Sequence, residues 1–110
     1  MKIREKDFPR AGTGAARMVE DIVGCKWSLT VLGLVAGGVQ RPGAMQRRVP
    51  GLSAKVLNER LRKLLRFGII EREVHAEVPP RVEYRLTDFG RKFEGVIREI
   101  AALDESLKLR

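Results

Sequence analysis

The chain has few of the residues from which catalytic and metal sites are usually built. Among its 110 residues it has one cysteine, Cys25, and one histidine, His75. A single cysteine excludes an intrachain disulfide and suits a reducing compartment. With no paired carboxylates converging on a loop either, no nucleophile–base pair or metal cluster can be assembled. An enzyme is therefore not expected, no cofactor or metal is implied, and His75 is expected to be an ordinary strand residue.

The sequence also lacks a long hydrophobic run. Its longest nearly uncharged apolar stretch, from Leu29 to Val39, is far shorter than the roughly 20 residues that span a bilayer. The first residues, Met1 to Asp7, are mostly charged and have no apolar segment behind them, unlike a signal peptide. A membrane partner is therefore not expected, and the sequence favours a cytoplasmic protein with a single domain.

What the chain does have is concentrated positive charge. The formal net charge is +8, and the stretch from Arg41 to Arg66 has eight basic residues against one acid, Glu59. These basic residues are Arg41, Arg47, Arg48, Lys55, Arg60, Arg62, Lys63 and Arg66. Duplex DNA presents a dense row of phosphates, and each phosphate that a protein neutralises releases condensed counterions. The charge therefore predicts a polyanionic partner, although a run of charges can also be only a solvated helix face.

Apolar spacing and turn residues predict a mostly helical α+β chain. Apolar residues recur at helical spacing, and alternating strands flank a proline-rich turn near the middle of the second half. The expected elements are a flexible arm over 1–14, helices over 15–23, 27–36 and 42–49, a fourth helix between Ser53 and Gly68, strands over 69–75 and 81–86, and a helix over 88–110. This order predicts one winged helix-turn-helix domain over 15–110, with a two-stranded β-wing and flanking N- and C-terminal helices.

Four residues give local signals for where the helices begin and end. Pro42 suits the first turn of the third helix, because its missing N–H costs nothing there. Ser53 is expected to cap the fourth helix, and Gly68 to end it in a left-handed conformation. Thr87 is expected to cap the last helix.

The fourth helix divides into an apolar and a polar face when its residues are placed at about 100° intervals. The apolar face is expected to pack on the helix that begins at Trp27. The apolar face of the fourth helix consists of Ala54, Leu57, Leu61, Leu64 and Leu65. The polar face of the same helix consists of Lys55, Asn58, Glu59, Arg62, Lys63 and Arg66. Arg60 projects toward the apolar side, so we expect it to form a structural ion pair with a glutamate elsewhere in the domain.

The polar face supplies candidates for contact with DNA. In a helix-turn-helix the second helix enters the major groove, and its N-terminal residues lie nearest the base edges. Ser53, Lys55 and Asn58 are therefore candidates for base contact, and the Asn58 amide could pair bidentately with adenine. An exposed polar residue without a partner is the alternative for Asn58. Arg62 and Arg66 lie further along the helix and are expected to meet phosphates.

Three arginines outside this helix are further candidates. Arg47 and Arg48 end the third helix, and the first helix of the motif usually crosses the DNA backbone. Arg81 follows the proline-rich tip of the hairpin, from which a wing can reach the minor groove. The alternative for Arg81 is a surface ion pair with Glu77 or Glu83.

The last helix carries an apolar seam with spacings of four and three residues, which is typical of helix pairing. The seam residues are Phe89, Phe93, Val96, Ile100, Leu103 and Leu107. The seam is expected to pair with the N-terminal helix or with the same helix of a second subunit. A two-fold dimer would place two recognition helices about 34 Å apart, which predicts a palindromic DNA site. Packing within one chain only is the alternative.

Four segments carry a resemblance to a known family. They are Gly24-Cys25-Lys26-Trp27, residues 50–61 (Pro-Gly-Leu-Ser-Ala-Lys-Val-Leu-Asn-Glu-Arg-Leu), residues 68–72 (Gly-Ile-Ile-Glu-Arg) and residues 78–87 (Val-Pro-Pro-Arg-Val-Glu-Tyr-Arg-Leu-Thr). Over about residues 15–95 the chain closely resembles the HxlR-type regulators, which are small dimeric winged-helix transcription factors of bacteria akin to the MarR group. The resemblance implies transcriptional regulation and dimerisation through the terminal helices.

The chain departs from the family pattern at two places. Many relatives have a Cys-Pro pair before the first helix, and in some of them that thiol senses oxidants; Gly14-Ala15 stands there in this chain. Cys25 instead occupies a position where relatives usually have glycine, near Lys26, whose charge favours a reactive thiolate. A redox role for Cys25 is thus one hypothesis, and an unreactive small residue is the preferred alternative. Arg41-Pro42 stands where relatives tend to have Arg-Phe, which changes the entry to the third helix.

The sequence favours one function over two alternatives. The leading function is a homodimeric, sequence-specific DNA-binding regulator of transcription, a repressor that occludes a promoter. The first alternative is a protein-interaction module whose basic face docks an acidic partner, as in some antirepressors. The second is RNA binding, but the phenylalanines lie at core-like positions and leave no exposed aromatic platform. No effector is indicated, since no polar group stands conspicuously within an apolar stretch.

Overall fold

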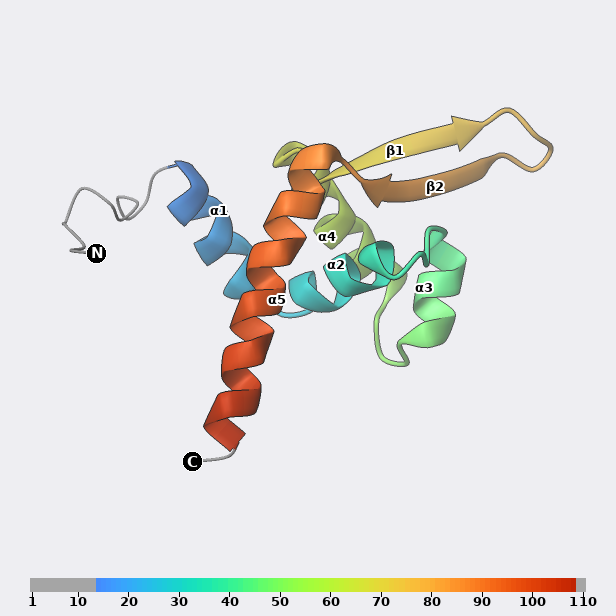
Figure 1. The fold of residues 1–110 in the computed structure, drawn as a ribbon. Helices are drawn as coiled ribbons and strands as arrows, with labels where there is room; N and C mark the ends of the chain where they lie inside the picture. The colour runs from blue at the N-terminus through green and yellow to red at the C-terminus, as the bar shows by residue number, and fades with distance from the viewer. Residues whose placement is uncertain (1–13, 109–110) are drawn as a thin grey trace.

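The computed structural model describes residues 14–108, which form five helices and one two-stranded sheet (Figure 1). The elements are α1 (Gly14–Val23), α2 (Ser28–Ala36), α3 (Pro42–Arg48), α4 (Ala54–Arg66), β1 (Ile70–His75), β2 (Arg81–Leu86) and α5 (Asp88–Lys108). The predicted winged helix-turn-helix with flanking helices is confirmed. The predicted arm lies outside the described residues except for Gly14, which begins α1. None of the described helices combines the length and the apolar character needed to cross a membrane.

Helix α2 lies at the centre of the domain, where it packs against α1, α4, α5 and β2. Val31, Leu32 and Val35 on this helix are buried, which confirms that it forms the apolar spine. The helix begins one residue later than predicted. Trp27 precedes it as the N-cap and adopts a left-handed conformation with a φ angle of 75°, so it does not belong to the first helical turn.

The local signals around α3 and α4 act as the sequence predicts. Pro42 occupies the first turn of α3, and Met45 anchors this short helix in the core. The Ser53 side-chain oxygen accepts a hydrogen bond from the Val56 backbone N–H at 3.1 Å, which caps α4. Gly68, just past the end of α4, has a φ angle of 73°, a conformation that residues with a side chain rarely adopt.

Strands β1 and β2 form the wing, which extends away from the helices in Figure 1. The strands are antiparallel, and their register runs from the pair Ile70–Leu86 at the base to the pair His75–Arg81 near the tip. Ile70 is buried, and the Tyr84 backbone N–H donates to the Gln40 carbonyl at 2.8 Å. The base of the wing is therefore held against the segment that leads into α3.

Helix α5 begins on the base of the wing and then projects away from the domain (Figure 1). The Thr87 hydroxyl caps it by accepting a hydrogen bond from the Gly90 backbone N–H at 2.9 Å, as predicted. Gly90 is required at this crossing, because a Cβ atom there would lie 1.8 Å from the Ile69 carbonyl oxygen. The missing side chain lets the first turn of α5 contact the start of the wing directly.

Candidate nucleic-acid interface

The exposed face of α4 is the first part of the candidate interface. The leucines at 57, 61 and 64 are almost fully buried, whereas Lys55, Asn58, Arg62 and Arg66 are exposed on the other side. This arrangement confirms the predicted division of the helix. Ala54 was expected on the apolar face but is exposed, because it lies in the first turn, beyond the edge of the core.

Lys63 does not belong to this exposed face, contrary to the sequence-based expectation. Its ammonium group donates to the Asp21 carbonyl at 3.3 Å and to the Cys25 sulfur at 2.7 Å. The side chain therefore joins α4 to the end of α1 and is half-buried. Lys63 was assigned to the polar face of α4, but it stabilises the packing of α4 against the end of α1.

The Cys25 thiol lies beside a different lysine from the one expected. Lys26 turns away and places its ammonium group 5.3 Å from the centre of the Trp27 ring, in a cation–π contact. Lys63 is the cation that reaches the half-buried sulfur. Sequence proximity pointed to the wrong partner, because the contact joins residues 38 positions apart. A redox role for Cys25 stays a prediction.

Arg60 has the structural role that was predicted but not the predicted partner. Its Nε–H donates to the Lys26 carbonyl oxygen at 2.9 Å. Within residues 14–108 no glutamate pairs with it. The bond satisfies a backbone carbonyl in the connection between α1 and α2, so Arg60 contributes to the fold.

The Ser53 side chain is already engaged in the fold. Its oxygen caps α4, as described above, and the residue remains exposed at the start of the helix. The hydroxyl hydrogen is still free to be donated to a base or a phosphate. Base contacts by Ser53, Lys55 and Asn58 stay predictions.

Arg47 and Arg48 lie in the last turn of α3 and are both exposed. In the described part of the chain, neither forms an ion pair with a carboxylate. Their charges are therefore available to a polyanion, and contact of Arg47 and Arg48 with the DNA backbone stays a prediction.

One face of the wing carries a network of ion pairs. Arg85 pairs with Glu71 at 3.0 Å and also with Glu73, while the His75 Nε2 atom lies 2.6 Å from a Glu83 oxygen. His75 therefore has a close carboxylate neighbour on the other strand, which the residues next to it in the sequence did not indicate. Between residues 14 and 108, no group of three or more potential ligands is arranged to hold a metal ion.

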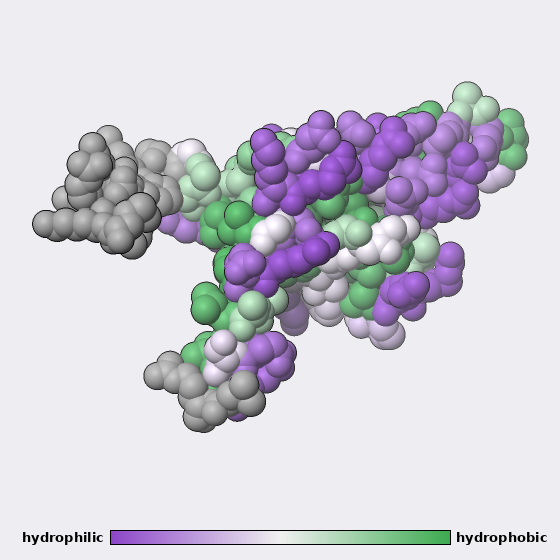
Figure 2. Space-filling model, in the orientation of Figure 1, coloured by the Kyte–Doolittle hydropathy of each residue, from purple (hydrophilic) through white to green (hydrophobic). Residues whose placement is uncertain are grey.

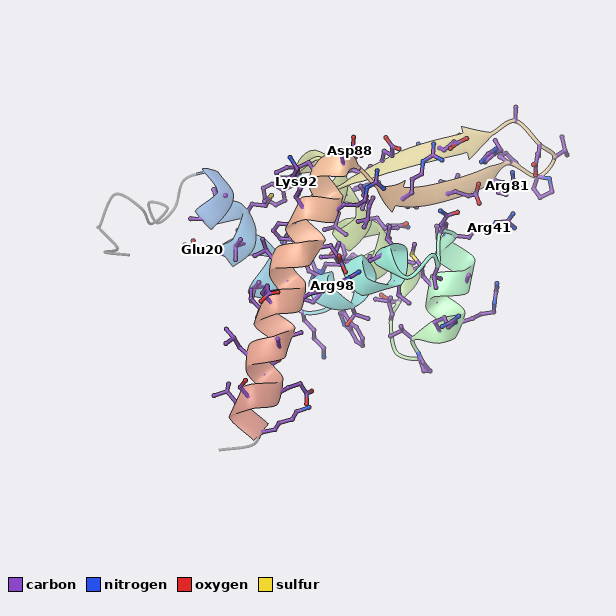
Figure 3. The ribbon with its side chains drawn as sticks, viewed as in Figure 1. Glu20, Arg41, Arg81, Asp88, Lys92 and Arg98 are labelled. Carbon is purple, nitrogen blue, oxygen red and sulfur yellow. The ribbon has the colours of Figure 1, made fainter. Side chains whose placement is uncertain are left out.

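Arg81 belongs to the same network. Its guanidinium lies 3.4 Å from a Glu77 oxygen and 3.7 Å from a Glu83 oxygen. The alternative of a surface ion pair thus describes this structure, and minor-groove contact by Arg81 stays a prediction. Arg81 and Arg41 line the same groove between the wing tip and α3, with a volume of about 420 Å³ (Figure 3).

Ion pairing separates the arginines into two groups. The paired ones, Arg81, Arg85, Arg91 and Arg98, all lie on β2 or α5. Within residues 14–108, the arginines of α3 and α4 form no ion pair, and neither does Arg72 of β1. Arg17 of α1 and Arg41, which precedes α3, are also without an ion pair in this part of the chain, so most but not all of the unpaired arginines lie on the helix-turn-helix and the adjoining strand.

Arg72 is a candidate that the sequence analysis missed. It is exposed and stands opposite Tyr84 in the sheet, on the face turned away from the ion-pair network. It borders one pocket together with Asn58 and Arg62 of α4. Strand alternation could have shown it, because Arg72 lies between Glu71 and Glu73 and must point to the other face of the wing.

Within residues 14–108, most of the seam of α5 remains exposed to solvent. Phe93 is buried, but Phe89, Val96, Leu103 and Leu107 are 47%, 51%, 63% and 58% exposed. Hydrophobic surface accordingly appears along α5 and beside α1 in Figure 2. The N-terminal part of the seam, Phe89, Phe93 and Val96, forms one wall of an apolar groove of about 530 Å³, and α1 forms the other wall. Glu20 and Lys92 lie on these two walls (Figure 3).

Together these features define a class of protein. A basic helix-turn-helix followed by a two-stranded wing is the architecture of winged-helix DNA-binding proteins. A family model described as HxlR-like helix-turn-helix matches residues 22–108. The chain therefore belongs to the HxlR-like family.

Individual relatives agree with this assignment. The HTH-type transcriptional regulator YtcD of Bacillus subtilis is 35% identical over 82 residues, which cover 74% of this chain and 65% of YtcD. YybR, an HTH-type transcriptional regulator of the same organism, is 36% identical over 106 residues and covers 96% of this chain and 85% of YybR. The chain thus spans slightly less than two thirds of YtcD and most of YybR.

Solved structures show the same fold. The crystal structure of YtcD superposes with a TM-score of 0.77 at 29% identity, covering 89% of this chain and 100% of that one. A MarR-family regulator from Porphyromonas gingivalis superposes with a TM-score of 0.71 at 33% identity, covering 89% of this chain and 96% of that one.

Proposed function

We propose that this protein is a transcriptional regulator that binds a palindromic DNA site as a homodimer and represses by occluding a promoter. The observation that carries the proposal is the gathering of uncompensated arginines on α3 and α4. Each such charge can neutralise a phosphate and release a counterion, whereas the ion-paired arginines of β2 and α5 would first have to lose their carboxylate partners.

The proposed homodimer is supported by the exposed seam of α5. Leu103 and Leu107 are each more than half exposed on the projecting part of the helix. They belong to the apolar seam, whose residues have heptad spacing and contact water in the single chain. Burying apolar side chains contributes about 25 cal/mol for each Å² removed from water. A second copy of α5, with the α1–α5 groove beside it, offers a surface that would cover the seam.

The proposed mode of DNA binding follows from the exposed face of α4. Lys55 and Asn58 lie in its first turns, from which a recognition helix reaches base edges. Arg66 ends the helix, where phosphates are closer, and Arg47 and Arg48 add two exposed charges in the last turn of α3. Because bacterial DNA lies in the cytoplasm, the proposal places the protein there.

The proposal is tested by fluorescence-anisotropy titration of the protein with two duplexes at about 100 mM salt. One duplex carries the region upstream of the protein's own coding sequence, and the other carries the same bases in scrambled order. Tighter binding to the upstream duplex by about 10³-fold or more would support a specific regulator. Equal affinity for the two duplexes would contradict sequence-specific binding to this region and would leave only non-specific DNA binding. Binding to neither duplex, even at low salt, would favour the alternative of an acidic protein partner.

The proposed dimer has its own test. Analytical ultracentrifugation at micromolar concentration should give the mass of two chains, and a monomeric mass at every concentration would contradict the homodimer.

A further inference from the structure

A polar pocket lies between the recognition helix and the wing. It has a volume of about 340 Å³ and is lined by Asn58, Arg62 and Leu65 from α4 and by Arg72 and Tyr84 from the two strands. Asn58 and Arg62 are one helical turn apart, so their side chains lie on the same face of α4. Among these lining residues Tyr84 is only 8% exposed, whereas both arginines are exposed.

The charge of this pocket is not compensated by the rest of the described chain. Neither Arg62 nor Arg72 forms an ion pair within residues 14–108. The glutamates on either side of Arg72 point to the opposite face of the wing, where they pair with Arg85. Two guanidinium groups beside one pocket repel each other unless an anion lies between them, so the pocket favours an anionic ligand.

The chemistry of the lining indicates which anion fits. A guanidinium presents its N–H donors as a planar fork that matches the oxygens of a phosphate, and the Asn58 amide can add another donor. The pocket borders the exposed face of α4, which is the face proposed to enter the major groove. The phosphates that flank that groove are therefore the anions that would meet it.

We propose that Arg72, together with Arg62 and Asn58, holds one phosphate of the DNA backbone in this pocket. The inference rests on the proposed function. It adds Arg72 on β1 to the predicted DNA interface, to which the sequence had assigned only Arg81 from the wing. Arg72 would fix the position of the duplex along α4 and would not read sequence, since phosphate contacts orient a protein without distinguishing bases. Asn58 would then be oriented partly by the phosphate and less free to read adenine.

The test uses the full chain and two matched variants. Arg72→Gln removes the proposed contact, and Arg85→Gln removes one charge from the opposite face of the same hairpin. Anisotropy titrations with a random duplex at about 50 to 200 mM salt give the slope of log affinity against log salt for each protein. Because the proposed homodimer carries the contact twice, Arg72→Gln should lower the magnitude of the slope by about one, and the affinity by about tenfold, for each copy. Arg85→Gln should leave the slope unchanged. Arg72→Lys should retain the slope, because the charge is kept. Thermal unfolding of each variant shows whether it is folded.

Each outcome has a distinct meaning. If wild-type protein binds duplex and both glutamine variants change the slope equally, the phosphate site is wrong but the proposed function stands. If wild-type protein does not bind duplex, the proposed function itself fails. A third experiment adds millimolar inorganic phosphate without DNA and measures thermal unfolding. The inference would be overturned if phosphate stabilised the wild-type protein but not Arg72→Gln, while Arg72→Gln bound DNA as the wild-type protein does. The pocket would then be assigned to a free anion.

Discussion

The ammonium group of Lys63 on α4 lies 2.7 Å from the sulfur of Cys25, which follows α1. The bond takes one cation of the basic stretch out of the surface proposed to meet DNA. It also joins the recognition helix α4 to the end of α1, so Lys63 stabilises the position of α4 on the side opposite the proposed DNA surface.

Lys63→Met should therefore destabilise the protein with little effect on DNA affinity. Methionine keeps the apolar stem but leaves the Asp21 carbonyl and the Cys25 sulfur without their donor, which should cost about 1–2 kcal/mol in the free energy of unfolding. Urea denaturation measures that cost. Lys55→Met is the matched control on the same helix, for which we expect unchanged stability. A larger loss of DNA affinity in Lys63→Met than in Lys55→Met would contradict the assignment.

Lys55→Ala should weaken binding to a specific DNA site more than binding to a random duplex. Lys55 is exposed in the first turn of α4, the part of a recognition helix nearest the base edges. Loss of a base contact should lower affinity for the specific site by about 1–3 kcal/mol. Competition titrations with both duplexes measure the difference, and an equal loss for the two would make Lys55 a phosphate contact.

Gly90→Ala should destabilise the domain strongly. The added Cβ would lie 1.8 Å from the Ile69 carbonyl oxygen, so α5 could remain on the wing only if the backbone moved. We expect a loss of more than about 2 kcal/mol in the free energy of unfolding. Gly95→Ala, in the same helix, has no neighbouring atom within 4 Å of its new Cβ and should stabilise by about 0.5–1 kcal/mol. Thermal unfolding of the two variants should therefore show shifts of opposite sign.

Leu103→Glu should split the proposed dimer without unfolding the monomer. Leu103 is 63% exposed within one chain, so a glutamate there meets only water unless a second copy covers it. Ile100→Glu should act in the same way, although Ile100 is half-buried and its variant tests packing as well. Sedimentation velocity measures the mass. Ala101→Glu adds the same charge beside the seam and should remain dimeric; an unchanged mass in Leu103→Glu would refute this interface.

The sequence predicted those features that depend on near neighbours. Pro42, Ser53, Gly68 and Thr87 each act within a few residues of their own position, so composition and spacing were enough to place the helix ends. The apolar face of α4 was equally clear, because leucines repeat along one side of the helix.

The errors concern contacts between distant parts of the chain. Lys63 and Arg60 lie at the border between the two faces of α4, and helical spacing alone does not say whether such side chains turn outward or reach a neighbouring helix. Their partners, near Cys25 and Lys26, are 34 to 42 positions earlier in the chain. The same limit explains Arg72, whose significance depends on a strand packing beside α4.

The most direct test of the central claim is the salt dependence of duplex binding by the wild-type protein. Anisotropy titrations at about 50 and 200 mM salt should differ by a factor of at least about 10³ in affinity, because several uncompensated cations on α3, α4 and β1 would each neutralise a phosphate. A nearly flat dependence, or no binding at the lower salt concentration, would contradict the claim that this surface binds DNA.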